Sequence, residues 1–527
     1  MLRYNIDYFL VREGQIFAYG WGFYSSSFVK NVILCVEFDS GSSIKVEAEY
    51  GRKRDDIRAL FPDNNEAENT GFLLYAGFDG QAITRALLCW EIENHSTIEV
   101  QLDLTQDTDA TKQGTFLKHH KLLFFKAISL LRSSGLRALK TKASRYLSNR
   151  PRTGNENDWK ELCAKLRGKS LTIIVDHDMG GGANIYRKKN VKEICRTGDV
   201  VLLLGFHIVT LQFFIEVFND NASNRFSIDS IDSLLLLASN GILHRIIYNC
   251  AVSFRQPSAV VNLLVMLKQQ PGVELLVLVH DYFMICPSHF LINSENKFCG
   301  VPHVSQCNIC LDNQRDGFVS MSGVRDIHIW RQTWATLLLA ADEVRMFSES
   351  SKQLLKRAYP ELPDMNWRVM PHELHTQLPR LQISNVTHLH IGVVGAVGKH
   401  KGAQVVSDLA YEILCRDMDV KITVIGTIEA KFPHGVVTVT GPYEANDLPE
   451  LIMNSGANIF LFPSIWGETF SYLSHELVAM ALPFACFDLG AQAELARRYE
   501  KGLVLSTMNV PDILDELGCF WKRIYQI

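Results

Sequence analysis

Two acidic side chains near the C-terminal end of the chain are the first candidates for binding chemistry. Glu468 and Glu476 stand eight positions apart in a largely apolar stretch, residues 462–495, and Glu494 follows a glycine-containing turn. An unpaired carboxylate is costly in apolar surroundings, so these groups need partners. Carboxylates accept hydrogen bonds from hydroxyl groups, and two on one helix face can hold separate polyol parts of one ligand. The ordinary alternative is a solvated helix face.

The segment around Glu468 is expected to combine its carboxylate with free backbone amides. The apolar strand ANIFLF ends in a Pro-Ser-Gly loop, and a helix is expected to open near Thr469. The first N–H groups of a helix have no partner within it, and the helix dipole favours negative charge there. The amides of Thr469, Phe470 and Ser471 are therefore predicted to be available to a ligand.

Two glycine-rich turns suggest a place for phosphate groups. Gly180, Gly181 and Gly182 follow the strand-like run LTIIVDHDM, and Lys401 lies in a second turn, GAVGKHKG. Glycine lets backbone N–H groups approach an anion, and an ammonium group can neutralise a diphosphate. Neither turn matches the dinucleotide fingerprint G-x-G-x-x-G with its later acidic residue. The alternatives are plain structural turns and an exposed loop lysine.

The strand-like run VELLVLVHDY contains a histidine near its end, and a group of cysteines follows it. His280 is either a core histidine at a strand end or a side chain that faces a ligand. Four cysteines lie within 25 residues, the last two as C-x2-C: Cys286, Cys299, Cys307 and Cys310. Four thiolates can hold a zinc ion, which would be structural because no coordination position stays open. The alternative is four free thiols.

The elements that position these residues fall into three kinds. The first 110 residues contain short alternating strands with Gly, Asp, Asn and Ser turns, which predict a β-sandwich. Its Trp21 and Trp90 either bind sugar or belong to the core. Residues 111–152 contain eleven Lys or Arg and no Asp or Glu. They predict a basic amphipathic helix, which either lies on an anionic membrane or packs as a linker.

From residue 153 onward, apolar strands alternate with helices in two successive series, which meet near residue 370. Such series predict two doubly wound parallel sheets, with ligands in the cleft between them. Domains are therefore expected at 1–110, 111–152, 153–370 and 371–527. The apolar residues 200–215 are too short for a membrane span and are expected to be a buried strand running into a helix.

Composition and cysteine content give no support for nucleic-acid binding or secretion. The chain has 527 residues, 47% hydrophobic and 21% charged, with a formal net charge of −4. This gives no support for nucleic-acid binding. The N-terminus lacks the cleavage site of a signal peptide, and twelve cysteines without a secretion signal indicate a reducing compartment. The expected location is the cytoplasm, either free or peripheral on the cytoplasmic face of the inner membrane.

These motifs together resemble retaining glycosyltransferases of family 4, which have the GT-B fold. The resemblance covers residues 169–505 and is most specific in the E-x7-E pattern of Glu468 and Glu476. It implies that the donor sugar is held by Glu468 and the amides of Thr469, Phe470 and Ser471, and that His280 lies beside the donor sugar and the acceptor. It also implies that Glu476 binds the ribose and Lys401 the diphosphate, and that the loop with Gly181 and Gly182 closes over the phosphates.

The resemblance implies an α/β protein of GT-B type, preceded by a β-sandwich and a basic linker helix. It implies transfer of a sugar from a nucleoside-diphosphate sugar to a glycan or lipid-linked glycan, as in O-antigen or capsule synthesis, with no metal needed for catalysis. Two residues depart from the family pattern: Ala396 replaces an arginine, and Ser471 replaces a glycine. The alternative is a glycan-binding or scaffold protein with an inactive core.

Overall fold

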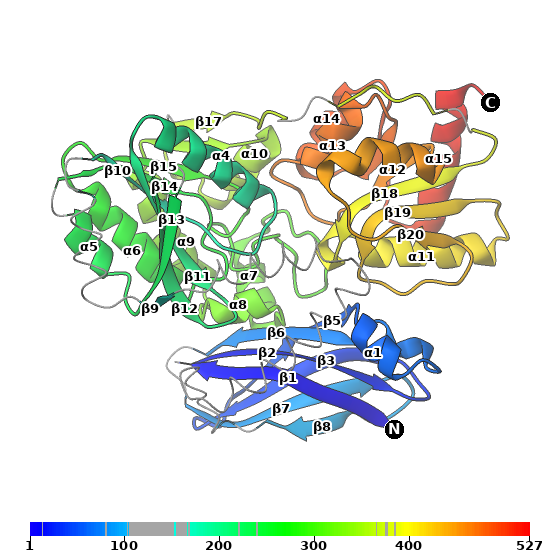
Figure 1. Ribbon diagram of the computed structural model, residues 1–527, viewed down its shortest axis with the longest axis horizontal. Coiled ribbons are helices and arrows are strands. Elements are labelled where there is room, and N and C mark those ends of the chain that lie inside the picture. The colour runs from blue at the N-terminus through cyan, green and yellow to red at the C-terminus, as the bar shows by residue number, and fades with distance from the viewer. Residues whose placement is uncertain are drawn as a thin grey trace. The chain divides into compact units, whose positions relative to one another are not determined.

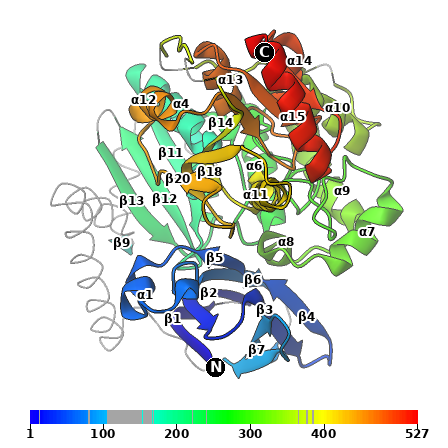
Figure 2. The same cartoon turned by 90° about the vertical axis from the view of Figure 1, so that its right-hand side faces the viewer.

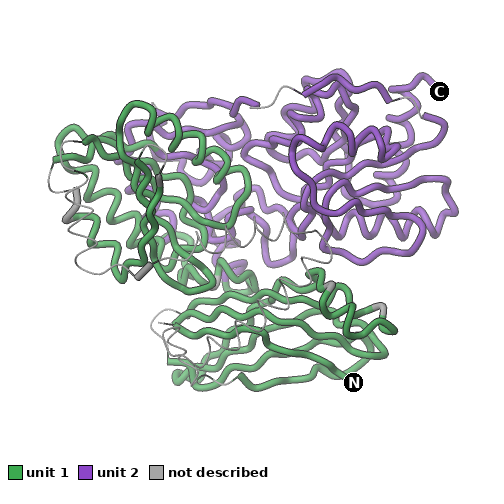
Figure 3. The backbone as a smooth tube through the Cα atoms, viewed as in Figure 1, with its two compact units in different colours: residues 1–276, 312–329 green, residues 277–311, 330–527 purple. Residues whose placement is uncertain are grey.

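The computed structural model describes residues 1–12, 14–78, 82–102, 104, 152–153, 166, 169–219, 222–238, 241–364, 366–374, 378–383 and 386–527. The chain divides into two compact units (Figure 3). Unit 1 comprises Met1–Leu276 and Asp312–Ile329, and unit 2 comprises Val277–Leu311 and Trp330–Ile527. The expected basic helix at 111–152 lies outside the described residues, apart from the two-residue strand β9, Arg152–Thr153.

The N-terminal part of unit 1 consists of two four-stranded antiparallel sheets with a shared core. One sheet has the order β1-β2-β6-β5 and the other β4-β3-β7-β8. Figure 2 draws the strands of both sheets in shades of blue. Their strands are β1 Leu2–Arg12, β2 Gln15–Tyr24, β3 Val29–Phe38, β4 Ser43–Glu47, β5 Glu49–Arg52, β6 Gly71–Gly77, β7 Ile83–Ile92 and β8 Ile98–Gln101, with the short helices α1 Asp55–Leu60 and η1 Asn65–Ala67. Alternate residues of β2, β3, β6 and β7 fill the core. Trp90 is fully buried there, which excludes it as a sugar platform, whereas Trp21 is half-buried against Phe23 and Phe61.

The α8 helix packs on this antiparallel part at two glycines. It spans Gly317–Met321 and belongs to the second segment of unit 1. A Cβ at Gly317 would lie 2.4 Å from the carbonyl oxygen of Tyr75, and one at Gly77 would lie 2.7 Å from the Cα of Met321. The Phe318 and Tyr75 rings pack with centroids 4.3 Å apart. Only glycine permits such close approach of two backbones.

The α/β part of unit 1 contains parallel strands extended by antiparallel ones. The strands β10 Leu171–Val175, β11 Val200–His207 and β14 Leu243–Tyr248 are parallel, whereas β12 Gln212–Asn219 and β13 Ala222–Ile228 continue from β11 as antiparallel strands. Residues 200–215 therefore form a hairpin, and the expected helix in this run is wrong. Helices α4 Gly182–Arg196, α5 Ser233–Ala238 and α6 Pro257–Lys268 connect the strands (Figure 1). The strand β15, Glu274–Leu278, leads into unit 2.

Unit 2 contains a six-stranded parallel sheet of order β20-β19-β18-β21-β22-β23. Its strands are β18 His390–Val397, β19 Lys421–Ile428, β20 Val437–Val439, β21 Ile459–Phe462, β22 Phe484–Phe487 and β23 Gly502–Leu505. Along β21, Ile459 and Leu461 join a core with α11 Ala403–Cys415 and α15 Val510–Tyr525. Phe460 and Phe462 join another with α12 Leu448–Ser455 and α14 Gly490–Arg498. Alternate residues therefore face opposite helical layers, as expected of a doubly wound sheet.

The remaining elements of unit 2 are β16 Glu343–Met346, β17 Trp367–Val369, α10 Glu349–Ala358, η2 Lys399–Lys401, η3 Ala445–Asp447 and α13 Tyr472–Ala479. Helices α7 Val304–Asn313 and α9 Ile327–Ala340 each cross a boundary between the units. The expected class, a GT-B-like α/β protein with parallel sheets after antiparallel ones, is confirmed by this strand order. Among the described residues, no helix combines the length and apolar character that a membrane span requires.

Candidate active site

The loop between β21 and α13 carries the first predicted site residue, Glu468. Helix α13 begins at Tyr472, and the Ser471 hydroxyl caps it by accepting the Ser474 N–H at 3.3 Å. The helix therefore starts three residues later than the expected opening near Thr469. Glu468 stands in the loop, so the expectation that it shares a helix face with Glu476 is wrong.

The Glu468 backbone is fixed by α14. Its N–H donates to the side-chain oxygen of Gln492 at 3.1 Å, and its carbonyl accepts the Ala491 N–H at 2.9 Å. The Gln492 amide also donates to the carbonyl of Trp466 at 2.9 Å. Gly490 has φ 57°, and a Cβ there would lie 2.6 Å from the Glu468 nitrogen. The loop is thus held by close backbone contact and a buried amide.

The Glu468 carboxylate is buried without full hydrogen bonding. Its side chain is 7% exposed, and Oε1 has no hydrogen-bond partner among the described residues. Burial raises the pKa of this carboxyl, whereas the charge of Lys401 and a hydrogen bond with Ser471 lower it. A buried acceptor that lacks a partner costs free energy. This group is therefore prepared to accept a hydrogen bond from a ligand.

Free amides and a histidine lie next to this carboxylate. The backbone N–H groups of Thr469, Phe470 and Ser471 donate no hydrogen bond to another described residue. The Thr469 hydroxyl donates to the carbonyl of His280 at 2.8 Å. His280 follows β15 at the strand end, as expected, and is half-buried. The structure thus brings His280 to the loop of Glu468 from a position 188 residues earlier in the chain.

A series of packed aromatic side chains continues from His280 to α13. Phe347 lies 4.7 Å from His280 and 3.8 Å from His372, measured between ring centroids, and His372 lies 4.6 Å from Phe470. Phe470 in turn stacks on His475 at 4.3 Å. His372 was not among the predicted site residues. The only signal for it was the Pro-His pair at the junction of the two strand–helix series.

Lys401 is the last residue of the short helix η2, which precedes α11, and it is exposed. Gly402 follows it with φ 82°, and a Cβ there would lie 2.0 Å from the carbonyl oxygen of Pro463. This approach brings the Lys401 turn against the strand end that leads to Glu468. Gly395 has φ 105° and open space at its Cβ position, and Ala396 beside it is exposed.

Glu476 lies on α13 and is half-buried. Burial raises the pKa of its carboxyl. Burial and the nearby Glu476 also raise the pKa of Tyr443 to about 12. Glu476 therefore lies near Tyr443, on the C-terminal side of the Glu468 loop.

Glu494, the third glutamate of the stretch, has a structural partner. Its carboxylate accepts the backbone N–H of Ser350 at 2.5 Å and that of Glu349 at 3.3 Å. These amides are at the N-terminus of α10, where the helix dipole favours an anion. Glu494 thus caps α10.

The first glycine turn lies in unit 1. Gly181 has φ 85° and caps α4, which begins at Gly182, as expected. The Gly180 N–H donates to Asn184 at 2.6 Å, and the Asn184 amide donates to Asp176 at 2.8 Å. Side chains from α4 thus hold the turn at the end of β10.

Comparison with known proteins finds a family match over part of this chain. Residues 388–522 match the family model described as "Glycosyl transferases group 1". No curated protein sequence matches the chain. The matched segment includes Lys401, Glu468 and Glu476.

Among solved structures, the chain is similar to Anabaena Alr3699/HepE in complex with UDP and glucose, with 13% identity, 66% of this chain and 89% of that chain covered, and a TM-score of 0.42. A Rickettsia africae glycosyltransferase is similar with 11% identity, coverage of 68% and 89%, and a TM-score of 0.43. Acinetobacter baumannii MurG is similar with 10% identity, coverage of 67% and 95%, and a TM-score of 0.32.

Proposed function

We propose that this protein is a retaining glycosyltransferase that moves a sugar from a nucleoside-diphosphate sugar to a glycan or lipid-linked glycan. The observation that carries this proposal is the Glu468 carboxylate, buried and with an unpartnered oxygen beside the free amides of Thr469–Ser471. Hydroxyl groups of a sugar would satisfy both sets of atoms. The glycosyl transferase family match over residues 388–522 supports the same ligand class.

The charges of the site suit a departing diphosphate. Lys401 is an exposed ammonium group that lies close enough to Glu468 to lower its pKa. In the proposed reaction, Lys401 and the loop amides stabilise the leaving diphosphate electrostatically, so catalysis needs no divalent metal. Glu476 binds the ribose.

The proposed chemistry keeps the anomeric configuration. The acceptor hydroxyl attacks the donor sugar from the face that the diphosphate leaves, and a phosphate oxygen takes the hydroxyl proton. The bond from the anomeric carbon to the acceptor forms as the bond to the phosphate oxygen breaks. His280 contributes by placing its half-buried imidazole beside the sugar and the acceptor. No carboxylate nucleophile is required, unlike in a retaining glycosidase.

We place the reaction on the cytoplasmic side of the inner membrane, in synthesis of a surface polysaccharide of O-antigen or capsule type. The run of eleven basic residues at 111–152 supports peripheral contact with an anionic membrane. Co-sedimentation with vesicles that contain anionic lipid tests this placement. Equal recovery with neutral vesicles would contradict it.

Donor binding is the direct test of the ligand class. The full chain is screened by thermal shift against UDP, GDP, ADP and their sugars, with UDP-glucose included. A ligand at 100 times its Kd stabilises a protein by about 2.7 kcal/mol, which gives a measurable shift. We expect one nucleotide family to raise the melting temperature. No shift with any nucleotide would contradict the proposal.

The alternative is a glycan-binding scaffold with an inactive core. Ala396 favours it, because a methyl group offers neither a positive charge nor a hydrogen-bond donor to phosphate. Release of the nucleoside diphosphate from the selected donor separates the two functions. The enzyme should release it with acceptor extract present, and the Glu468→Gln variant should release it roughly 10- to 150-fold more slowly. Equally low release by both proteins, with glycan binding retained, would favour the scaffold.

A further inference from the structure

The four clustered cysteines occupy one loop of unit 2, residues 286–310, called here the cysteine loop. Cys307 and Cys310 lie three residues apart on α7, which places them on one face of that helix. Cys286 lies just after Ile285, and the Cys299 N–H donates to the Leu291 carbonyl at 2.8 Å. The Arg331 guanidinium donates to both the Ile285 carbonyl at 3.3 Å and the Cys307 sulfur at 3.9 Å, and the Ser294 N–H donates to the Cys310 sulfur at 3.3 Å. The loop therefore folds back on itself and lies against α7.

Each of the four sulfurs accepts a hydrogen bond or faces a cation. The donors are the Ser288 N–H to Cys286, the Val301 N–H to Cys299, the Ser294 N–H to Cys310 at 3.3 Å, and the Arg331 guanidinium to Cys307 at 3.9 Å. Such donors stabilise a thiolate much more than a neutral thiol. Thiolates are the form in which cysteine binds zinc, and donors to the ligand atoms are a usual outer shell of metal sites.

The four thiols also lie close enough to affect one another electrostatically. Burial raises the pKa of Cys286, and Cys299, Cys307 and Cys310 each raise it further. Burial likewise raises the pKa of Cys299 to about 11, with contributions from Cys307 and Cys310. The four sulfurs therefore lie near one another in the cysteine loop.

We propose that Cys286, Cys299, Cys307 and Cys310 bind one structural zinc ion. Among the described residues, these sulfurs do not form a group of three within 4.8 Å of one another. Zinc–sulfur bonds of about 2.3 Å would draw the four sulfurs closer together than they lie in this structure. Four thiolates leave no open coordination position, so the ion has a structural role and not a catalytic one.

The cysteine loop packs on both candidate donor turns, so zinc would also position the active site. The Phe290 ring stacks on His400 at 4.1 Å and lies 4.6 Å from Trp466. The Phe298 ring lies 3.3 Å from the position of a Cβ at Gly467. His400 precedes Lys401, and Gly467 precedes Glu468. This second part of the inference rests on the proposed function, whereas zinc binding does not.

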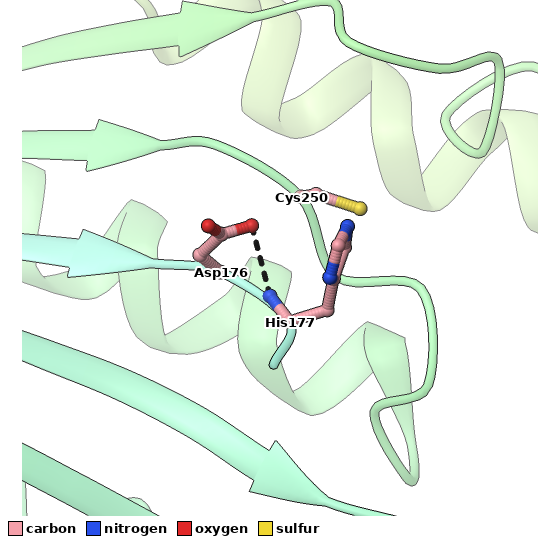
Figure 4. Close-up of side chains that lie close together, drawn as sticks. All are labelled: Asp176, His177 and Cys250. Atoms are coloured by element: carbon pink, nitrogen blue, oxygen red, sulfur yellow. Dashed lines mark hydrogen bonds between the residues drawn. The ribbon is translucent and has the colours of Figure 1, made fainter. Parts of the chain in front are cut away.

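Another cluster is compact but a poorer metal site. Asp176, His177 and Cys250 are buried, and their ligand atoms lie within 4.8 Å of one another (Figure 4). The Asp176 carboxylate, however, accepts a hydrogen bond from the Arg187 guanidinium at 2.8 Å and forms a buried ion pair with it. A metal ion would have to displace that cation. The cluster thus serves to hold the first glycine turn.

Metal analysis of the full chain tests the proposal. Protein expressed with added zinc and purified without chelator should contain about one zinc ion per chain. The Cys307→Ser and Cys310→Ser variants should lose most of it, while Cys415→Ser, an exposed cysteine of α11, should retain it. Cobalt substituted for zinc should show thiolate charge-transfer absorption in wild type and not in Cys307→Ser.

If a variant does not fold, measurements on the wild-type chain alone still test the proposal. A mercurial reagent that blocks thiols should release the zinc stoichiometrically, and proteolysis within residues 286–310 should then become faster. A folded wild-type protein without zinc would overturn the proposal, and so would zinc that Cys307→Ser and Cys310→Ser both retain. If zinc is present but its release leaves donor binding unchanged, the positioning of the active site by the metal is refuted. Zinc content does not depend on any donor, so failure of the proposed function is seen separately.

Discussion

Replacing Glu468 with glutamine should stabilise the free protein and impair donor use. The pKa of this carboxyl is raised in the folded state, mainly by burial. Between its unfolded and folded pKa values, the folded state binds more protons than the unfolded state, so stability falls as pH rises through that window. Above the folded-state pKa, the full cost of the buried charge is present. The side-chain amide of the Glu468→Gln variant carries no charge and should remove part of that cost.

The magnitudes follow from one unpartnered buried atom. Such an atom costs about 1–3 kcal/mol, and because an amide must also find partners, we expect a gain of about 1 kcal/mol. In a unit of this size that raises the melting temperature by about 2–4 °C. A hydrogen bond between a charged group and a sugar hydroxyl contributes about 1.5–3 kcal/mol. Its loss should lower kcat/KM roughly 10- to 150-fold.

The assay combines thermal melts between pH 5 and 8 with steady-state kinetics. The difference in melting temperature between variant and wild type should narrow as pH falls, because protonation relieves the wild-type carboxylate. Glu494→Gln is the matched control, since that carboxylate caps α10 by accepting two backbone amides. It should destabilise the protein by about 0.5–2 kcal/mol. A Glu468→Gln protein that melts lower than wild type at pH 7 and retains its kcat/KM would refute the reasoning.

Three further substitutions test other contacts. Gly402→Ala places a Cβ 2.0 Å from the Pro463 carbonyl at φ 82°, and should cost about 2–4 kcal/mol in denaturant unfolding; an unchanged midpoint would contradict it. Burial, and to a lesser degree Lys401, lowers the pKa of His400 to about 3. Wild type should therefore lose stability as pH falls from 6.5 towards 3, and His400→Phe should lose less over that range; parallel pH profiles would count against this. Gly317→Ala, with a Cβ 2.4 Å from the Tyr75 carbonyl, should weaken the contact of α8 with β6 and increase proteolysis there; unchanged cleavage would argue otherwise.

The sequence predicted the features that depend on local chemistry. Strands followed by glycine turns located Gly181 and Gly402, because positive φ and close backbone approach both require glycine. His280 was placed correctly at a strand end because β-branched and apolar residues stop just before it. Alternation of polar and apolar residues likewise predicted the antiparallel sheets, in which Trp90 proved to be core.

Features that depend on distant partners could not be read from the sequence. The hairpin of β11 and β12 was mistaken for a strand and a helix, because a continuous apolar run has no decisive period. The start of α13 was predicted three residues too early. The serine that caps the helix, Ser471, accepts a hydrogen bond from the Ser474 N–H. The role of Glu494 depends on amides 144 and 145 positions away, which no local pattern reveals.

The contacts around Glu468 explain why its unfavourable environment persists. Two glycines, Gly402 and Gly490, bring neighbouring backbones against the loop from different elements, and Gln492 fixes it by two buried hydrogen bonds. The loop cannot relax to hydrate or pair the carboxylate without breaking these contacts. Strain of this kind is retained where surrounding structure determines it. A ligand hydroxyl therefore meets an acceptor already oriented, and the free energy lost in the empty protein is recovered on binding.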